Sequence, residues 1–246
     1  MILADVSLLS PGQFAAACLI VMIGAFVQGS VGFGLSMVSA PLLLLIDPVL
    51  IPGPVLGLSL CLNLLVTHRE RRSVDVPAIA WALPGRVVGT VVAAWVLGAF
   101  NGLVYEYLFA SLVLLAVIMS IGGIRPRPTH KNLLVAGTLS GFMGTVSSIG
   151  GPPMALVHQD TSGAQLRGTL APFFVFGTFL SIATLTAIGE YRAPGFIATL
   201  ILLPALGIGF LLSRHGAALL DRGFTRHAVL SLSAVSAVAV LLKTML

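Results

Sequence analysis

Charged side chains are scarce in this sequence. Of its 246 residues, 13 are Lys or Arg and 8 are Asp or Glu, which together make 9% of the chain. An ordinary soluble domain carries about 25% charged residues, so this chain cannot build a water-facing surface. We therefore exclude a soluble fold and intrinsic disorder. The hydrophobic share of 57% is instead typical of a protein that has a lipid bilayer as its solvent.

Signatures of enzymes and metal sites are also missing. The two cysteines lie in apolar runs, and the five histidines have no metal-ligand spacing. The motifs GxxxxGK[ST], HExxH and GxSxG do not occur. All acidic residues lie at or near expected loops, so the sequence shows no buried carboxylate relay of the kind that pumps use. We expect no enzymatic activity, no metal and no cofactor.

Long apolar runs are what the sequence has in abundance. A spanning helix needs about 20 apolar residues, so the chain has room for about six to nine. Lipid-exposed backbone must satisfy its own hydrogen bonds, which favours helices, and the runs lack the alternation of barrel strands. The predicted helical runs cover residues 13–46, 52–67, 77–99, 103–124, 132–157, 168–189, 193–213 and 226–245.

Basic residues crowd three loops, at 67–76, 125–131 and 213–227. The positive-inside rule places all three loops in the cytoplasm. Three apolar runs separate the second loop from the third, and an odd number of crossings would put these two loops on opposite sides. One of the three runs must therefore fail to cross, or must cross twice.

The run 132–157 is the best candidate for this exception, because Ser147–Pro153 interrupts it with residues that no straight helix favours. The run 13–46 has a similar break at Gly29–Gly34. If both runs enter and return on one side, the chain has six full spans and two re-entrant hairpins. The alternative is eight spans with one weak loop that breaks the charge rule.

The two halves of the chain resemble each other. Each half of the hairpin arrangement crosses three times, so the second half would be inverted relative to the first. Inverted repeats with broken helices are typical of secondary transporters. We predict an all-α polytopic membrane protein whose single membrane domain contains a first repeat, 1–124, and an inverted second repeat, 125–246. The matching segments are Gly24–Gly34 with Gly141–Gly151, Pro84–Gly89 with Pro204–Gly209, and Ser111-Leu112 with Ser231-Leu232.

The two glycine-rich breaks are the strongest candidates for a binding site. A helix that begins inside a membrane exposes N–H donors and a partial positive charge, which suit an anion. The alternative is that the glycines only permit close packing, which we prefer for the GxxxG pairs at 53–57, 85–89 and 137–141. The candidate substrate ligands at the breaks are Gln28, Ser30, Gly32, Phe33, Gly34, Ser147, Ser148, Gly150, Gly151 and Pro152.

Arg86 is the one basic residue well inside an apolar run. It would supply charge to an anion, or it would snorkel to the interface. Asn63 is a second candidate ligand, although an interhelical hydrogen bond is the favoured alternative. His158, Asp160 and Arg167 would form a gate or proton relay, or an ordinary polar loop.

These motifs resemble the sulfite exporter TauE/SafE family, also called toluene sulfonate uptake permeases. The resemblance covers essentially the whole chain, although Gly34 is followed here by Leu35-Ser36 where the family has Gly-Gly-Gly. It implies a multi-pass transporter of the bacterial inner membrane for sulfite, sulfoacetate or other organosulfonates, with export the commoner assignment. The residues that carry it are Gly29-Ser30-Val31-Gly32-Phe33-Gly34, Gly144–Pro153, Pro84-Gly85-Arg86 with Gly89, and Arg167 before Phe173-Phe174.

The residues alone indicate an anion-preferring secondary transporter that works by alternating access at a midplane site. An anion channel and a non-transporting assembly component stay open as alternatives. The expected partners are a small anionic substrate and the lipid bilayer, with no nucleic acid, and a homodimer is one possible assembly.

Overall fold

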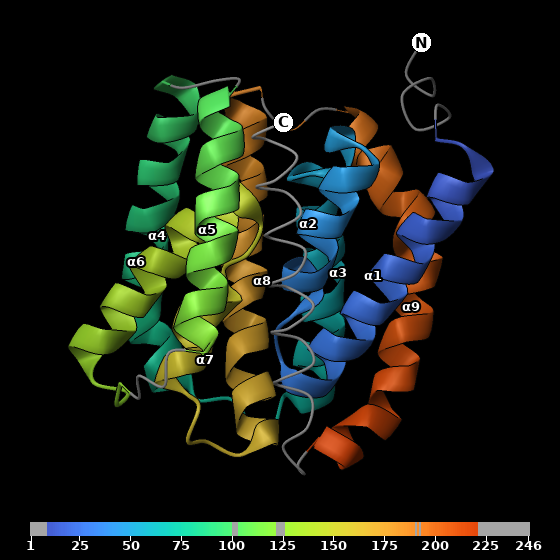
Figure 1. Ribbon diagram of the computed structural model, residues 1–246. Helices are drawn as coiled ribbons and strands as arrows, with labels where there is room; N and C mark the ends of the chain where they lie inside the picture. The colour runs from blue at the N-terminus through green and yellow to red at the C-terminus, as the bar shows by residue number, and fades with distance from the viewer. Residues whose placement is uncertain (1–8, 100–102, 122–125, 190, 192, 221–246) are drawn as a thin grey trace.

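The computed structural model describes residues 9–99, 103–121, 126–189, 191 and 193–220 (Figure 1). These ranges are helical and contain no β-strand, which confirms the predicted all-α class. The predicted run 226–245 and its repeat element Ser231-Leu232 lie outside the described residues. The elements are α1 (Pro11–Val31), α2 (Leu35–Ile46), the short 3-10 helix η1 (Pro48–Leu50), α3 (Gly53–Glu70), α4 (Val76–Ala99), α5 (Leu103–Ile121), α6 (His130–Ser147), α7 (Gly151–Val157), α8 (Gly163–Ala187) and α9 (Ala193–Leu220).

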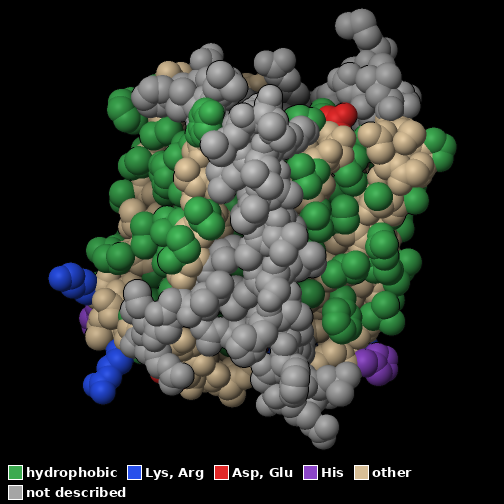
Figure 2. Space-filling model, in the orientation of Figure 1, with side chains coloured by type: hydrophobic (Ala, Val, Ile, Leu, Met, Phe, Trp, Pro, Cys, Tyr) green, Lys and Arg blue, Asp and Glu red, His purple; other side chains and the backbone are tan. Residues whose placement is uncertain are grey.

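Within the described ranges, five helical segments are long and apolar enough to cross a membrane: α1, η1 with α3, α4, α8 and most of α9. Large apolar side chains point outward from them, such as Trp95 at 72% exposure and Phe179 at 65%. Figure 2 shows hydrophobic side chains over the described surface between the two ends of the molecule. Such a surface is costly in water and is stable where acyl chains cover it.

The first predicted break folds α1 and α2 into a hairpin. Gly32 ends α1 in a left-handed conformation, at φ +105°, and its N–H donates to the Gln28 carbonyl at 2.7 Å. The two helices then run antiparallel. Two contacts show this: the Leu35 N–H donates to Gln28 Oε1 at 3.1 Å, and further along Ser39 Oγ lies 3.5 Å from the Ile20 carbonyl. Figure 1 shows α2 returning toward the end from which α1 descends.

The second predicted break does the same to α6 and α7. Ser148 follows α6 at φ 63°, and α7 begins at Gly151 after a short irregular segment. Across this segment, Ser140 Oγ donates to the Gly150 carbonyl at 2.6 Å. In Figure 1, α6 rises to the middle of the molecule and α7 descends again. Both breaks are therefore hairpin turns rather than kinks in straight helices.

Glycines allow two pairs of helices to touch backbone to backbone. A Cβ at Gly89 of α4 would overlap the Thr138 carbonyl oxygen of α6, and one at Gly137 would overlap the Ala82 carbonyl. Likewise, a Cβ at Gly209 of α9 would overlap the Met22 carbonyl of α1. The packing role that we predicted for Gly85–Gly89 and Gly137–Gly141 is therefore confirmed.

These pairings join the two halves of the chain. The first helix of the first half, α1, packs on α9, and the first helix of the second half, α6, packs on α4. This exchange of partners is compatible with the predicted duplication. The inverted repeat and its boundary at residue 124 remain predictions.

The described parts of the three basic loops lie at one end of the molecule. Arg69 of α3 donates to Ser213 of α9 at 3.1 Å. Trp81 of α4 stacks on His130 of α6, with 4.1 Å between ring centroids. In Figure 2, Lys, Arg and His side chains gather toward the lower end. This arrangement is the one that the positive-inside rule requires.

The contact between α4 and α6 leads to a stability prediction. We expect Gly89→Ala to lower the stability of the detergent-purified protein by about 1–3 kcal/mol, because the new methyl group must push two backbones apart. Gly98→Ala is the matched control in the same helix, since a Cβ there meets nothing within 4 Å. Thermal unfolding compares the two variants. Equal melting temperatures for both would contradict the close packing.

Candidate functional site

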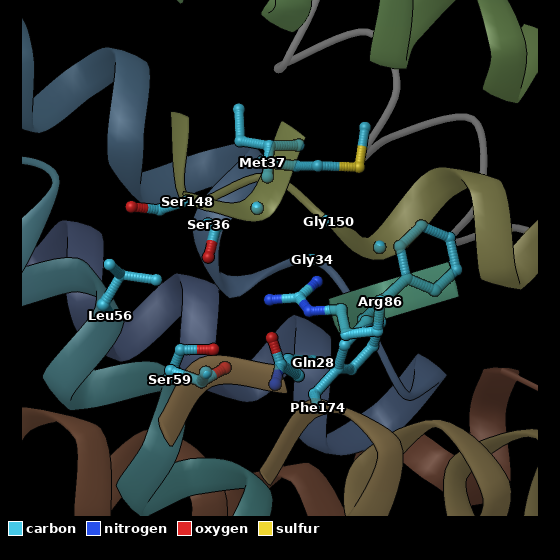
Figure 3. Close-up of a pocket in the computed structure, with 15 residues that line it drawn as sticks. Gln28, Gly34, Ser36, Met37, Leu56, Ser59, Arg86, Ser148, Gly150 and Phe174 are labelled. Atoms are coloured by element: carbon cyan, nitrogen blue, oxygen red, sulfur yellow. The ribbon is translucent and has the colours of Figure 1, made fainter. Parts of the chain in front are cut away.

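A small cavity lies between the two hairpin turns (Figure 3). Its volume of about 30 Å³ has room for a few water molecules, since one water needs about 10–15 Å³. The cavity therefore suits a compact ion rather than a bulky organic molecule. Its walls combine polar and apolar side chains with the backbone of both breaks: Gln28, Phe33, Gly34, Ser36, Met37, Leu56, Ser59, Arg86, Gly144, Ser148, Ile149, Gly150, Gly151, Phe174 and Thr178.

Arg86 of α4 brings a positive charge to this cavity. Its side chain is only 2% exposed, so it points into the protein and the snorkelling alternative is wrong. Nη1 donates to the carbonyl and hydroxyl oxygens of Ser140 at 2.6 and 3.0 Å, and Nη2 donates to Ser181 Oγ at 3.2 Å. Among the described residues, buried Nε has no hydrogen-bond partner and no acidic side chain pairs with the guanidinium.

Three glycines make room for the guanidinium. A Cβ at Gly144 or Gly150 would lie 2.8 or 2.9 Å from Nη1, and one at Gly177 of α8 would overlap Nε. The ring of Phe173 lies under the charge, 5.9 Å from Cζ. Several elements are therefore shaped to hold a cation that has no carboxylate partner in the described part of the chain.

A chain of hydrogen bonds runs along the opposite wall. It begins at the backbone N–H of Leu35, the first residue of α2, which donates to Gln28 Oε1. Gln28 Nε2 donates to Asn63 Oδ1 at 2.9 Å, and Asn63 Nδ2 donates to Ser59 Oγ at 3.2 Å. In Figure 3 the guanidinium of Arg86 points toward the side where Gln28, Ser36 and Ser59 lie.

The structure brings only part of the predicted site together. The predicted residues that line the cavity are Gln28, Phe33, Gly34, Arg86, Ser148, Gly150 and Gly151. Asn63 stands behind the wall in an interhelical bond, which was the favoured alternative for it. The other predicted ligands, Ser30, Gly32, Ser147 and Pro152, do not line the cavity; Ser30 and Ser147 bond to the carbonyls of Phe26 and Met143 in their own helices.

Other lining residues escaped the sequence reasoning. Ser59 lies one helical turn before Asn63, so the shared face of α3 was a usable signal. Ser36 follows the first break directly. For the lining residues of α8, Phe174 and Thr178, the apolar run gave no signal, because they reach the cavity only through packing between helices.

A second polar cluster, the Arg69–Glu70–Arg167 cluster, covers the turn of the first hairpin at the basic end. Glu70 Oε1 accepts from Arg69 Nε at 3.1 Å and from Arg167 Nε at 3.0 Å. Both arginines also bond to the last carbonyls of α1: Arg69 to Gly29, and Arg167 to Ser30 at 2.9 Å. Cations at a helix C-terminus are favourable, so this cluster holds the end of α1 in place.

Comparison with known proteins gives one match. The model of the sulfite exporter TauE/SafE family matches residues 16–240, nearly the whole chain. The chain belongs to the sulfite exporter TauE/SafE family. No curated protein and no solved structure matches it.

Membership places the chain among membrane transporters of sulfur-containing anions. It thereby confirms the resemblance that the glycine-rich motifs indicated. Arg86 and both hairpin turns lie within the matched residues. The two breaks that suggested the TauE/SafE family are therefore the elements that meet at the cavity.

Of the predicted gating residues of this TauE/SafE protein, only Arg167 belongs to the cluster at the basic end. Asp160 is exposed in the loop after α7. His158 is buried at the end of α7, where Nδ1 lies 3.0 Å from the Met154 carbonyl and Nε2 has no partner among the described residues. Burial lowers the pKa of the imidazole, against the carbonyl of Met154 and the charge of Asp75, which raise it.

His158 makes the stability of the protein depend on pH. Because its pKa is lower in the folded state than the ordinary 6.5, the unfolded state binds the proton more readily. Stability is therefore complete above about pH 6.5 and falls as the pH drops below that value. We expect His158→Gln to flatten this fall in melting temperature between about pH 7 and about pH 5. The exposed His215→Gln should keep the wild-type slope, and an unchanged slope in His158→Gln would contradict the assignment.

Proposed function

We propose that this protein is a secondary transporter that exports small sulfur-containing anions, such as sulfite or organosulfonates, from the cytoplasm. It would act in the bacterial inner membrane, by alternating access at the cavity between the two hairpin turns. The family match supports the class of substrate, and the arrangement of charges supports the position of the site.

The observation that carries the proposal is that no acidic side chain in the described part of the chain pairs with Arg86. An isolated buried cation is costly, and breaking a buried ion pair destabilises a protein by about 3–5 kcal/mol. An oxyanion in the cavity would supply a negative charge beside Arg86 and accept from donors around it. A guanidinium suits this task because its N–H groups match the geometry of an oxyanion.

The remaining walls favour the same class of ligand. Ser36, Ser59 and Thr178 contribute hydroxyl groups, while Phe33 and Phe174 contribute apolar surface. Hydroxyl groups and aromatic rings around one cavity suit a small anion that has a charged head and a short apolar part.

The Arg69–Glu70–Arg167 cluster is the cytoplasmic gate in this proposal. It lies at the basic end and fastens the hairpin turn that forms one wall of the cavity. Substrate access from the cytoplasm would then require Arg167 to leave Glu70 and the Ser30 carbonyl. The Arg167 side chain is only 11% exposed, so its departure from Glu70 would uncover buried surface at the hairpin turn.

The central test replaces Arg86. We expect Arg86→Gln to reduce sulfite efflux from proteoliposomes at least about 100-fold, because the anion loses its buried partner. The folded yield should be preserved, and the melting temperature should not fall, since the variant removes an uncompensated charge. The exposed Arg72→Gln is the matched control. Wild-type efflux by Arg86→Gln would refute the site.

Counterflow separates a carrier from the two rival functions. Substrate on the far side of the membrane accelerates exchange by a carrier and does not accelerate a channel. A non-transporting assembly component predicts neither flux nor stabilisation of the folded protein by sulfite. A ligand that binds only the folded state must raise its apparent stability by mass action, so a melting-temperature series with sulfite, methanesulfonate and acetate tests binding without flux.

The gate gives a further prediction. The assay introduces a cysteine into the cavity by Ser36→Cys and adds an impermeant thiol reagent on the cytoplasmic side. We expect Arg167→Gln to increase the labelling rate of this cysteine several-fold. Cys18→Ser and Cys61→Ser remove the background. Arg71→Gln, an exposed arginine at the same end, is the matched control. Equal labelling in both variants would show that the cluster does not close the cavity.

A further inference from the structure

The hydrogen-bond chain behind the cavity has a fixed direction. We infer that Ser59 is an obligatory hydrogen-bond donor to the transported anion, and that the Leu35 N–H imposes this direction through Gln28 and Asn63. The inference rests on the proposed function, since it assigns a further specificity-determining residue in the same site.

The direction of these hydrogen bonds is set by the backbone N–H of Leu35. A backbone N–H can only donate, so the Gln28 atom 3.1 Å from the Leu35 nitrogen must be the amide oxygen. The amide nitrogen of Gln28 must then face Asn63. Side-chain amides are ordinarily assigned by their networks, and here the backbone settles the assignment.

The same argument fixes the direction of the next two hydrogen bonds, which lead to the cavity. Because Gln28 donates, the Asn63 atom 2.9 Å away is its oxygen, and the amide nitrogen of Asn63 faces Ser59. An amide N–H can only donate, so Ser59 Oγ accepts. The hydroxyl keeps one proton of its own, which must be donated elsewhere.

The cavity is where that proton can go. Many serines in apolar helices donate to a carbonyl one turn back, as Ser30 and Ser147 do here. Ser59 makes no such bond among the described residues, and it lines the cavity. Figure 3 shows it on the side that the Arg86 guanidinium faces. An oxygen of a bound anion would therefore lie between a cation and a hydroxyl whose proton has no other acceptor among the described residues.

This arrangement selects by polarity as well as by charge. A ligand whose head carries acceptors only, such as sulfite or a sulfonate, would accept the Ser59 proton and pair with the charge of Arg86. A ligand that presents N–H donors to this wall would leave the Ser59 proton without an acceptor, which is costly in a buried site.

The first experiment measures binding by calorimetry to the full-length protein in detergent, with sulfite and methanesulfonate as probes. We expect Ser59→Ala to raise Kd about tenfold, in line with a hydrogen bond to a charged group. Ser73→Ala, in the loop between α3 and α4, should leave Kd unchanged. Should Ser59→Ala fold poorly, Ser59→Cys keeps the side chain in place with a much weaker donor and should show the same loss.

The second experiment reverses the direction of the hydrogen bond between residue 63 and Ser59. Asn63→Asp introduces a carboxylate that accepts from both Gln28 and Ser59, so the Ser59 proton turns away from the cavity. The new charge would also repel the anion, but it would do so whether or not Ser59 is present. A double-mutant cycle therefore isolates the direction of the hydroxyl. We expect Asn63→Asp to weaken binding about tenfold more in the wild-type background than in the Ser59→Ala background.

The outcomes separate this inference from the proposed function. Equal effects of Asn63→Asp in both backgrounds, or an unchanged Kd in Ser59→Ala, would overturn the role of Ser59 while leaving the anion site intact. Absence of sulfite and methanesulfonate binding to the wild-type protein would instead refute the proposed function.

Discussion

The positive charge of Arg86 lies in the interior of the protein, on a helix whose other face meets lipid. Its guanidinium is buried, fastened at two nitrogens and without an acidic partner in the described part of the chain. Gly144, Gly150 and Gly177 leave the space that it occupies. One arrangement therefore includes the close contact of α4 with α6, the turn before α7 and the position of α8. Glycines on these elements leave the space in which a cation is held in a low-dielectric interior.

The two hairpins provide what straight helices could not. A continuous helix pairs all of its backbone groups internally, so it presents only side chains to a ligand. Breaking α1–α2 and α6–α7 places irregular backbone in the interior, where such backbone is tolerated if it is buried in protein or lines a cavity. The first hairpin turn is held by polar side-chain bonds of the Arg69–Glu70–Arg167 cluster, whereas α4 and α6 touch backbone to backbone.

The identities of the cavity residues were only partly predictable, and the errors have a common cause. Ser30 and Ser147 sit in the glycine-rich breaks and looked like ligands, yet both bond to carbonyls in their own helices. Ser59 sits in an apolar helix without a break, and it lines the cavity while Asn63, one turn later, donates to its hydroxyl. A serine in an apolar helix has the same local pattern in both situations, and its partners depend on tertiary contacts such as the one between Gln28 and Asn63.

The sequence by itself determined the solvent, the class of fold and the places where the helices break. A composition with 9% charged residues excludes a water-facing surface, and Gly, Ser and Pro interrupt a helix for local reasons. The motifs also sufficed to indicate the TauE/SafE family. Tertiary structure alone decided that Arg86 turns inward instead of snorkelling, that Asn63 supports the site from behind, and that α8 supplies Phe174 and Thr178. Each of these depends on space and partners supplied by helices distant in the chain, which no local pattern encodes.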